Sequence, residues 1–231
     1  MYDFQLFRWV PVFITILFGK SAADYKVHWD NLFLSMGLSS YEEFKESFPG
    51  NTSDFSDALR VGFFNAVKSL EINQKDGDYD ESDIASYYQF CMIHFSRSQS
   101  RISRNRSIID QEDVDSFNFT IDQLFAFKEG DFKLFYAKAV TFMETFPRAK
   151  KWMKWYLNPK RAVILFNACK DPGNNAKQNI LSKNTNAEEN IGKQIQFLSL
   201  DPKIGIGQCI ELLWKFTNNF IVDDQSWENA R

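Results

Sequence analysis

The sequence has few of the residues and motifs on which most enzymes rely. It contains two histidines, His28 and His94, and they do not form the His-x-x-x-His pair of a helical zinc site. Gly205-Ile-Gly207 lacks the third glycine of a dinucleotide-binding loop, and no Gly-Lys-Ser/Thr phosphate loop or Gly-x-Ser-x-Gly elbow is present. Both histidines lie in apolar surroundings, so we interpret them as partly buried structural residues. We predict no catalytic site and no enzymatic activity.

Cysteine and net charge are also scarce. The three cysteines, Cys91, Cys169 and Cys209, exclude a disulfide-framework protein and allow one bridge with a free thiol, or small buried side chains. A net charge of -3 and a pI near 5.5 provide no global attraction to nucleic acid or to an anionic membrane. We therefore expect no nucleic-acid partner; a small hydrophobic ligand or a protein partner fits better.

No apolar run reaches the ~20 residues that a membrane-spanning helix needs. The apolar run at 9–19 follows Arg8 and precedes Ser21-Ala-Ala-Asp24, which is the layout of a secretory signal. We expect residues 1–23 to be a signal peptide, cleaved after Ala22 or Ala23, and the mature chain to be secreted. The alternative interpretation is a buried or peripheral N-terminal helix.

A secreted chain can be glycosylated, and three acceptor triplets are present: Asn51-Thr-Ser, Asn105-Arg-Ser and Asn118-Phe-Thr. Asn51 follows a Pro-Gly pair and has the most loop-like context, so we expect sugar there first. Asn118 is the least favoured acceptor, because its two phenylalanine neighbours are expected to be buried.

Aromatic residues are abundant: the chain has 24 phenylalanines, six tryptophans and eight tyrosines in 231 residues. This content is sufficient for one large core or two small ones. A filled, phenylalanine-rich core is the favoured interpretation, and a ligand cavity is the alternative. In that alternative, large side chains from several predicted helices line an apolar pocket: Phe63, Phe95, Phe135, Trp152 and Trp214.

Apolar residues recur with the 3.6-residue period of amphipathic helices through most of the chain. The clearest example is 131–156, which predicts two helices hinged at Pro147. Another helix is predicted from Ile84 to Phe95, with the apolar stripe on one face. We predict an all-α fold of helix-loop-helix pairs around an aromatic core, in a single domain at 24–231 with halves at 24–128 and 129–231.

An acidic stretch at 71–83 separates two of these predicted helices. A calcium loop of the EF-hand type needs oxygen ligands at its first, third and fifth positions, glycine at the sixth and a carboxylate at the twelfth. With Gly77 at the sixth position, Asp76 is fifth and Asp83 twelfth, and one extra loop residue brings two earlier side chains into range. The expected ligands are Glu71, Asn73, Asp76, Asp78 and Asp83.

A second acidic segment, at 110–124, precedes another predicted helix. Asp113 and Asp115 resemble the front of a calcium loop, although Phe125 occupies the position of the closing carboxylate. The residues that could assist metal binding are Asp110, Glu112, Asp113 and Asp115. Just before it, 96–107 interleaves four arginines with five serines, which favours a solvated helix end and linker. An anion or phosphate patch is the alternative for that segment.

The arrangement of four helix-loop-helix units over 56–224 resembles the four-EF-hand sarcoplasmic calcium-binding proteins and their calexcitin-like relatives. The resemblance is carried by Leu70-Glu-Ile-Asn-Gln-Lys-Asp-Gly77, by Phe146-Pro147 with Trp152 and Tyr156, and by the last helix at 212–224. The loops expected at 167–180 and 201–209 have few ligands. The resemblance implies an EF-hand-like calcium-binding protein; the incomplete loops predict weak binding, and the predicted signal peptide predicts secretion. The alternative is a secreted carrier or interaction protein that uses its aromatic interior.

Overall fold

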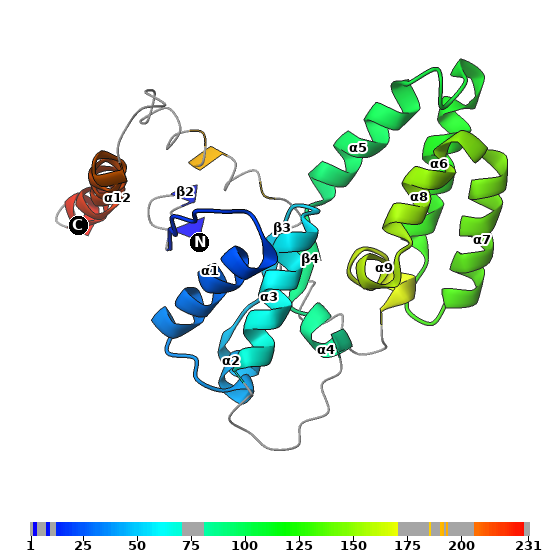
Figure 1. The fold of residues 1–231 in the computed structure, drawn as a ribbon. Helices are drawn as coiled ribbons and strands as arrows, with labels where there is room; N and C mark the ends of the chain where they lie inside the picture. The colour runs from blue at the N-terminus through cyan, green and yellow to red at the C-terminus, as the bar shows by residue number, and fades with distance from the viewer. Residues whose placement is uncertain are drawn as a thin grey trace. The chain divides into compact units, whose positions relative to one another are not determined.

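The computed structural model describes residues 2–3, 8–9, 13–70, 81–170, 185, 190, 191, 193 and 206–228. Within these ranges, side chains are described from residue 13 onward and, in the last helix, for residues 207–218. The chain divides into two compact units, one formed by 17–184 and the other by 1–16 with 185–231. Helices dominate the described residues (Figure 1), which confirms the all-α prediction.

The larger unit begins with three helices and a short strand: α1 (Ala22–Ser35), α2 (Tyr41–Ser47), β3 (Asn51–Ser53) and α3 (Asp57–Ser69). Each helix begins after a serine whose hydroxyl accepts a backbone N–H from the first turn, namely Ser21, Ser40 and Ser56. The expected signal cleavage after Ala22 or Ala23 therefore falls inside the first turn of α1, and would remove its N-cap.

The helix predicted from Ile84 to Phe95 is wrong, because the chain is extended in the middle of this segment. It forms α4 (Glu81–Ala85), β4 (Tyr88–Phe90) and α5 (Met92–Arg104). β4 pairs in parallel with β3, Asn51 opposite Tyr88 and Ser53 opposite Phe90. Tyr88 and Phe90 are both buried. Burial of every second residue along a strand therefore accounts for the same apolar residues that predicted a helix.

The second half of the larger unit is helical: η1 (Gln111–Asp113), α6 (Val114–Ala126), α7 (Phe132–Thr145), η2 (Pro147–Ala149), α8 (Lys150–Tyr156), α9 (Pro159–Leu165) and η3 (Asn167–Cys169). The predicted pair of helices hinged at Pro147 corresponds to α7 and α8. The smaller unit contains an antiparallel pair, β1 (Tyr2–Asp3) with β2 (Arg8–Trp9), and α12 (Ile206–Glu228). Among the described helices, none is both long and apolar enough to cross a membrane.

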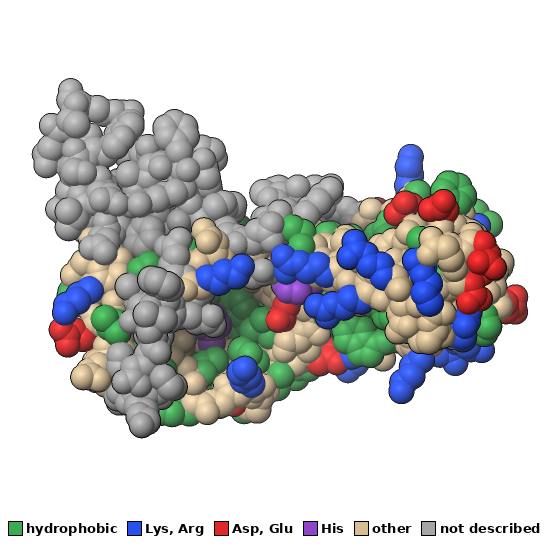
Figure 2. Space-filling model, turned by 90° about the horizontal axis from the view of Figure 1, so that it is seen from above, with side chains coloured by type: hydrophobic (Ala, Val, Ile, Leu, Met, Phe, Trp, Pro, Cys, Tyr) green, Lys and Arg blue, Asp and Glu red, His purple; other side chains and the backbone are tan. Residues whose placement is uncertain are grey.

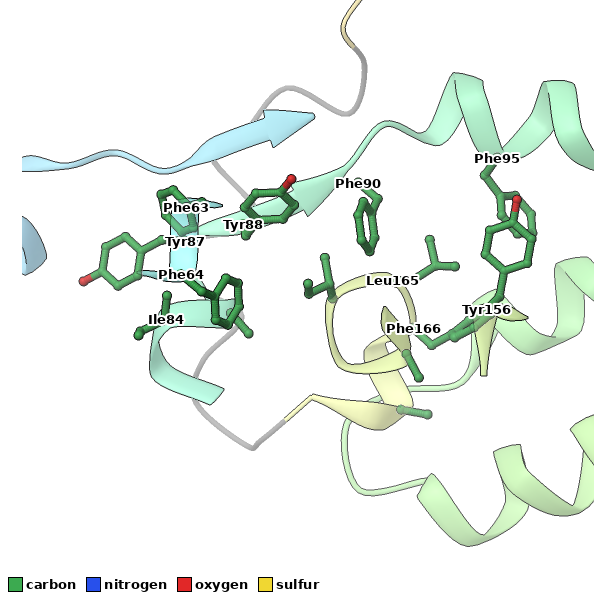
Figure 3. Packing of buried hydrophobic residues seen from close by; sticks show 14 of the residues in the cluster. Phe63, Phe64, Ile84, Tyr87, Tyr88, Phe90, Phe95, Tyr156, Leu165 and Phe166 are labelled. Atoms are coloured by element: carbon green, nitrogen blue, oxygen red, sulfur yellow. The ribbon is translucent and has the colours of Figure 1, made fainter. Parts of the chain in front are cut away.

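The core of the larger unit is a continuous series of packed aromatic rings (Figure 3). Its first part, the Phe63 cluster, consists of five buried rings from α1, α2, α3 and the turn after α2: Trp29, Phe33, Phe44, Phe48 and Phe63. The rings of Trp29 and Phe63 have centroids 5.1 Å apart, and those of Phe44 and Phe48 lie 4.9 Å apart. From there, Tyr88, Phe90 and Phe55 connect this cluster to Tyr156 in the second half.

Candidate functional site

Three of the five side chains predicted to line a pocket are buried in the aromatic core. Phe63, Phe95 and Phe135 are at most 2% exposed. The ring of Phe95 lies 4.9 Å from that of Phe125, and the ring of Phe135 lies 4.9 Å from that of Phe166, measured between centroids. Each ring is thus surrounded by protein. Trp214 lies on α12 of the smaller unit and is 66% exposed. Trp152 lines an open groove between described residues.

The calcium loop predicted at 71–83 lies mostly outside the described residues. Four of the five predicted ligands lie outside the described residues: Glu71, Asn73, Asp76 and Asp78. Asp83 is exposed on α4, which has five residues. Lys68, which precedes the stretch, forms an ion pair with Glu81 inside it, with 2.8 Å between Nζ and Oε1. Across the part of the chain that the structure describes, no three His, Cys, Asp or Glu side chains are grouped as metal ligands.

The second acidic segment forms a 3-10 turn and the start of α6 rather than an open loop. The side chains of Glu112, Asp113 and Asp115 are exposed. The Asp110 carboxylate accepts a hydrogen bond from the Arg148 guanidinium, which holds the pKa of Asp110 below its ordinary value. The structure therefore gives Asp110 a partner on another element.

The two histidines lie on separate helices, His28 on α1 and His94 on α5, and both are half-buried. The His28 ring lies edge-on to that of Trp29, with centroids 5.0 Å apart, and burial lowers its pKa. A lowered pKa means that His28 remains neutral at physiological pH. This environment agrees with a structural role.

Among the described residues, one set of side chains that could contact a ligand lies between α5 and α8. There an open groove of about 540 Å³ is lined by aromatic, aliphatic and basic side chains: Ser98, Ile102, Ile108, Arg148, Lys151, Trp152, Trp155 and Tyr156. We call it the α5–α8 groove. Its volume lies within the ~300–1,000 Å³ typical of small-molecule sites.

One side of the groove is fixed by a hydrogen bond between the two helices. The indole N–H of Trp152 donates to the Ser98 hydroxyl over 2.9 Å. The Trp152 ring also lies against Phe95 and Tyr156, with centroid distances of 5.8 and 5.1 Å. Burial raises the pKa of the Tyr156 phenol, so this residue stays protonated beyond its ordinary range. The groove floor is consequently uncharged and rigid.

Trp155 forms the outer part of the floor and is 38% exposed. Its ring centroid lies 4.8 Å from that of Tyr156. The Arg161 guanidinium covers the Trp155 ring at 3.9 Å from the centroid, and also donates to the Trp155 carbonyl and to the Asp57 carboxylate. A cation over the face of an indole is attractive, so the Trp155 side chain is held in place before any ligand arrives.

The rim of the groove is basic. Arg148 and Lys151 line it directly, and none of the described residues that line it is acidic. The helices on both sides carry further basic side chains and no acidic ones: Arg97, Arg101 and Arg104 on α5, and Lys150 and Lys154 on α8. Figure 2 shows Lys and Arg side chains gathered on the face of the molecule that includes α5. The lining of the groove is therefore basic although the chain as a whole is acidic, and Arg148 is paired with the Asp110 carboxylate outside the groove.

Part of this site could have been found in the sequence. Arg148, Lys151, Trp152 and Trp155 have the i, i+3, i+4 and i+7 spacing that places side chains on one helix face. The pocket predicted from the sequence included Trp152 but not Trp155, Arg148 or Lys151. The position of α5 opposite this face is a tertiary feature with no local signal.

The predicted glycosylation sites differ in accessibility. Asn51 is the first residue of β3 rather than part of a loop, and its side-chain nitrogen, which would carry the sugar, is buried. Asn105 follows α5 and is exposed. Asn118 is half-buried on α6, where its side-chain oxygen accepts from Gln99. Asn105 therefore has the most accessible acceptor in the folded chain.

Comparison of the chain with protein-family models, with curated proteins and with solved structures finds no match. The resemblance to EF-hand proteins stays an expectation from the sequence, and the functional argument rests on the geometry of the α5–α8 groove.

Proposed function

We propose that this protein is a non-catalytic binding protein that accommodates the apolar part of a small ligand in the α5–α8 groove. The observation that supports this is the open groove itself, in which the 38% exposed Trp155 lies beside Trp152, Ile102 and Ile108. Open apolar concavities with a few polar groups are the usual sites of small ligands. The ligand body lies against Trp155 and Trp152, with Ile102 and Ile108 around it.

The geometry favours binding because the groove is built before the ligand arrives. The Ser98 hydrogen bond holds Trp152, and the Arg161 guanidinium holds Trp155. A ligand therefore orders few side chains when it binds, and less conformational entropy is lost. The ligand gains the burial of apolar surface, worth roughly 25 cal/mol per Å² before the costs of association.

Titration with the neutral fluorescent arylamine N-phenyl-1-naphthylamine tests this proposal. Trp155→Ala is expected to weaken binding about tenfold, equivalent to ~1.4 kcal/mol of lost contact with the ring. Trp214→Ala is the matched control, since it removes an exposed indole from the smaller unit. Equal affinities of the two variants would contradict the proposal.

Weak calcium binding at 71–83 is a second candidate, which rests on the spacing of the acidic residues around Gly77. Calorimetric titration with calcium in the millimolar range tests it, because extracellular sites function at affinities around 10⁻⁴ to 10⁻³ M. Heat that disappears in Asp76→Ala and Asp83→Ala is expected. No heat, and no change in melting temperature at several millimolar calcium, would exclude a site.

Secretion is proposed on the sequence pattern of residues 1–23. N-terminal sequencing of protein from a secreting host is expected to find a start near Asp24. An intact Met1 would contradict it.

A further inference from the structure

The basic rim of the α5–α8 groove bears on the chemical class of the ligand. Arg148 and Lys151 line the same opening, and none of the described lining residues offers a carboxylate to neutralise them inside the groove. Close to them, Trp152 and Trp155 present apolar surface. A molecule that fits this arrangement has an apolar body and one negative charge at its end.

The Arg148 guanidinium already shows how an anion is held at this rim. It donates to the carboxylate of Asp110, which comes from the turn before α6 and does not line the groove. Both side chains are about half exposed, at 49% and 51%. An exposed ion pair of this kind contributes little to stability, so an incoming anion can replace Asp110 at small cost. Asp110 thus acts as an internal competitor for Arg148.

We propose that the groove binds an amphiphilic anion, a small soluble molecule with an apolar body and one carboxylate, sulfonate or phosphate group. The inference rests on the proposed function, because the apolar body occupies the groove floor. The anionic group contacts Arg148, whose planar guanidinium offers two parallel N–H donors to such groups, and Lys151 supplies a second positive charge.

A single-stranded nucleic acid, which also combines charge with flat rings, fits less well. Base stacking requires an open aromatic face for each successive base. One face of the Trp155 ring is already covered by Arg161 at 3.9 Å. The described groove therefore accommodates one apolar body rather than a series of bases.

Two probes that share one body and differ in charge test the inference. 8-Anilinonaphthalene-1-sulfonate carries a sulfonate that N-phenyl-1-naphthylamine lacks. The wild-type chain is expected to bind the sulfonate about tenfold more tightly at low salt, the low end for a hydrogen bond to a charged group. The preference is expected to shrink as ionic strength rises, because exposed charges are screened.

Substitutions at the rim are expected to change the affinity for the anionic probe alone. Arg148→Gln and Lys151→Gln should lower it toward that of the neutral probe. Asp110→Asn should raise it about threefold, because Arg148 loses its internal competitor. Lys133→Gln is the matched control, since it removes a charge from an exposed position of α7 that does not line the groove. Circular dichroism establishes that each variant keeps its helical content.

The outcomes separate this inference from the proposed function. If both probes bind equally and depend on Trp155, the proposed function stands and the anionic ligand is wrong. If neither probe responds to Trp155→Ala, both fail. Binding to vesicles of phosphatidylglycerol without binding of the monomeric sulfonate would also overturn the inference, and would assign the basic rim to a membrane surface.

Discussion

The larger unit has a first half, α1 to α3 with the β3–β4 pair, and a second half, α5 to η3, and the two halves use aromatic residues in different ways. In the first half, α1, α2 and α3 enclose the Phe63 cluster, in which Phe44 and Phe63 are fully buried. In the second half, Trp152 and Tyr156 pack toward the core, whereas Trp155 of the same helix remains 38% exposed beside a groove. Aromatic content alone therefore does not distinguish a core from a binding site. The distinction depends on how completely a neighbouring helix covers the rings.

In each half, a local feature of the helices determines how completely the aromatic rings are covered. Gly62 allows α1 and α3 to approach closely, since a Cβ placed there would lie 2.7 Å from the Tyr25 Cβ and 2.9 Å from the Ala22 carbonyl. In the second half, α8 has seven residues between η2 and the Asn158-Pro159 helix start. This two-turn helix is shorter than the 13-residue α5, and the groove lies between the two helices.

The largest expected effect is that of Phe63→Ala in the closed half. Removal of a fully buried ring leaves a cavity and is expected to lower the free energy of unfolding by ~3–5 kcal/mol. Urea denaturation measures it, with Phe119→Ala as control because Phe119 is 62% exposed. A loss below ~1 kcal/mol at Phe63 would show that the cluster is not closed.

The second prediction concerns the pH dependence of Cys169, in η3 of the second half. Burial raises its thiol pKa from 9.0 to about 11, so the neutral thiol persists to higher pH. Because the folded pKa is the higher one, the associated stability is present below pH 9 and is lost as pH rises from 9 to 11.

At pH 8, alkylation of Cys169 in a Cys209→Ser variant is expected to be about a hundredfold slower than that of a free thiol with the ordinary pKa. Iodoacetamide labelling with mass spectrometry measures the rate. Cys91, which is fully buried, serves as the unreactive reference. Labelling of Cys169 at the rate of a free thiol would contradict the burial seen here.

A smaller effect is expected for Gly62→Ala, which tests the closeness of α1 and α3. The added methyl group has no room against backbone atoms, and overpacking of this kind costs ~1–3 kcal/mol. The control is Gly207→Ala in α12, where a Cβ meets nothing within 4 Å. There the better helix propensity of alanine is expected to stabilise the chain by up to ~1 kcal/mol. Equal thermal shifts in both variants would argue against a tight crossing.

The smallest expected effect is that of Ser98→Ala in the groove. The Trp152 indole N–H loses its acceptor, which costs ~1 kcal/mol, and the ring is freed to move. Denaturation and the tryptophan emission maximum measure these changes. Ser96→Ala, at an exposed position of α5, is the control, and identical behaviour of the two would mean that the hydrogen bond does not position Trp152.

The sequence predicted well where one local pattern dominates. The apolar period and Pro147 predicted α7 and α8, because proline ends a helix by removing a donor and clashing with the preceding turn. The helix predicted from Ile84 to Phe95 failed because Tyr88 and Phe90 fit a strand as well as a helix. Only pairing with β3, far upstream in the chain, decides between them.

The sequence by itself determined the helical class and the aromatic core, because both follow from short-range periodicity and from the free energy of burying apolar surface. It also contained the basic and aromatic face of α8. Only the tertiary structure decided that Phe63 is enclosed while Trp155 borders a groove, and that Asp110 meets Arg148. Those features depend on which elements lie opposite one another, and such long-range contacts produce no periodic pattern in the sequence.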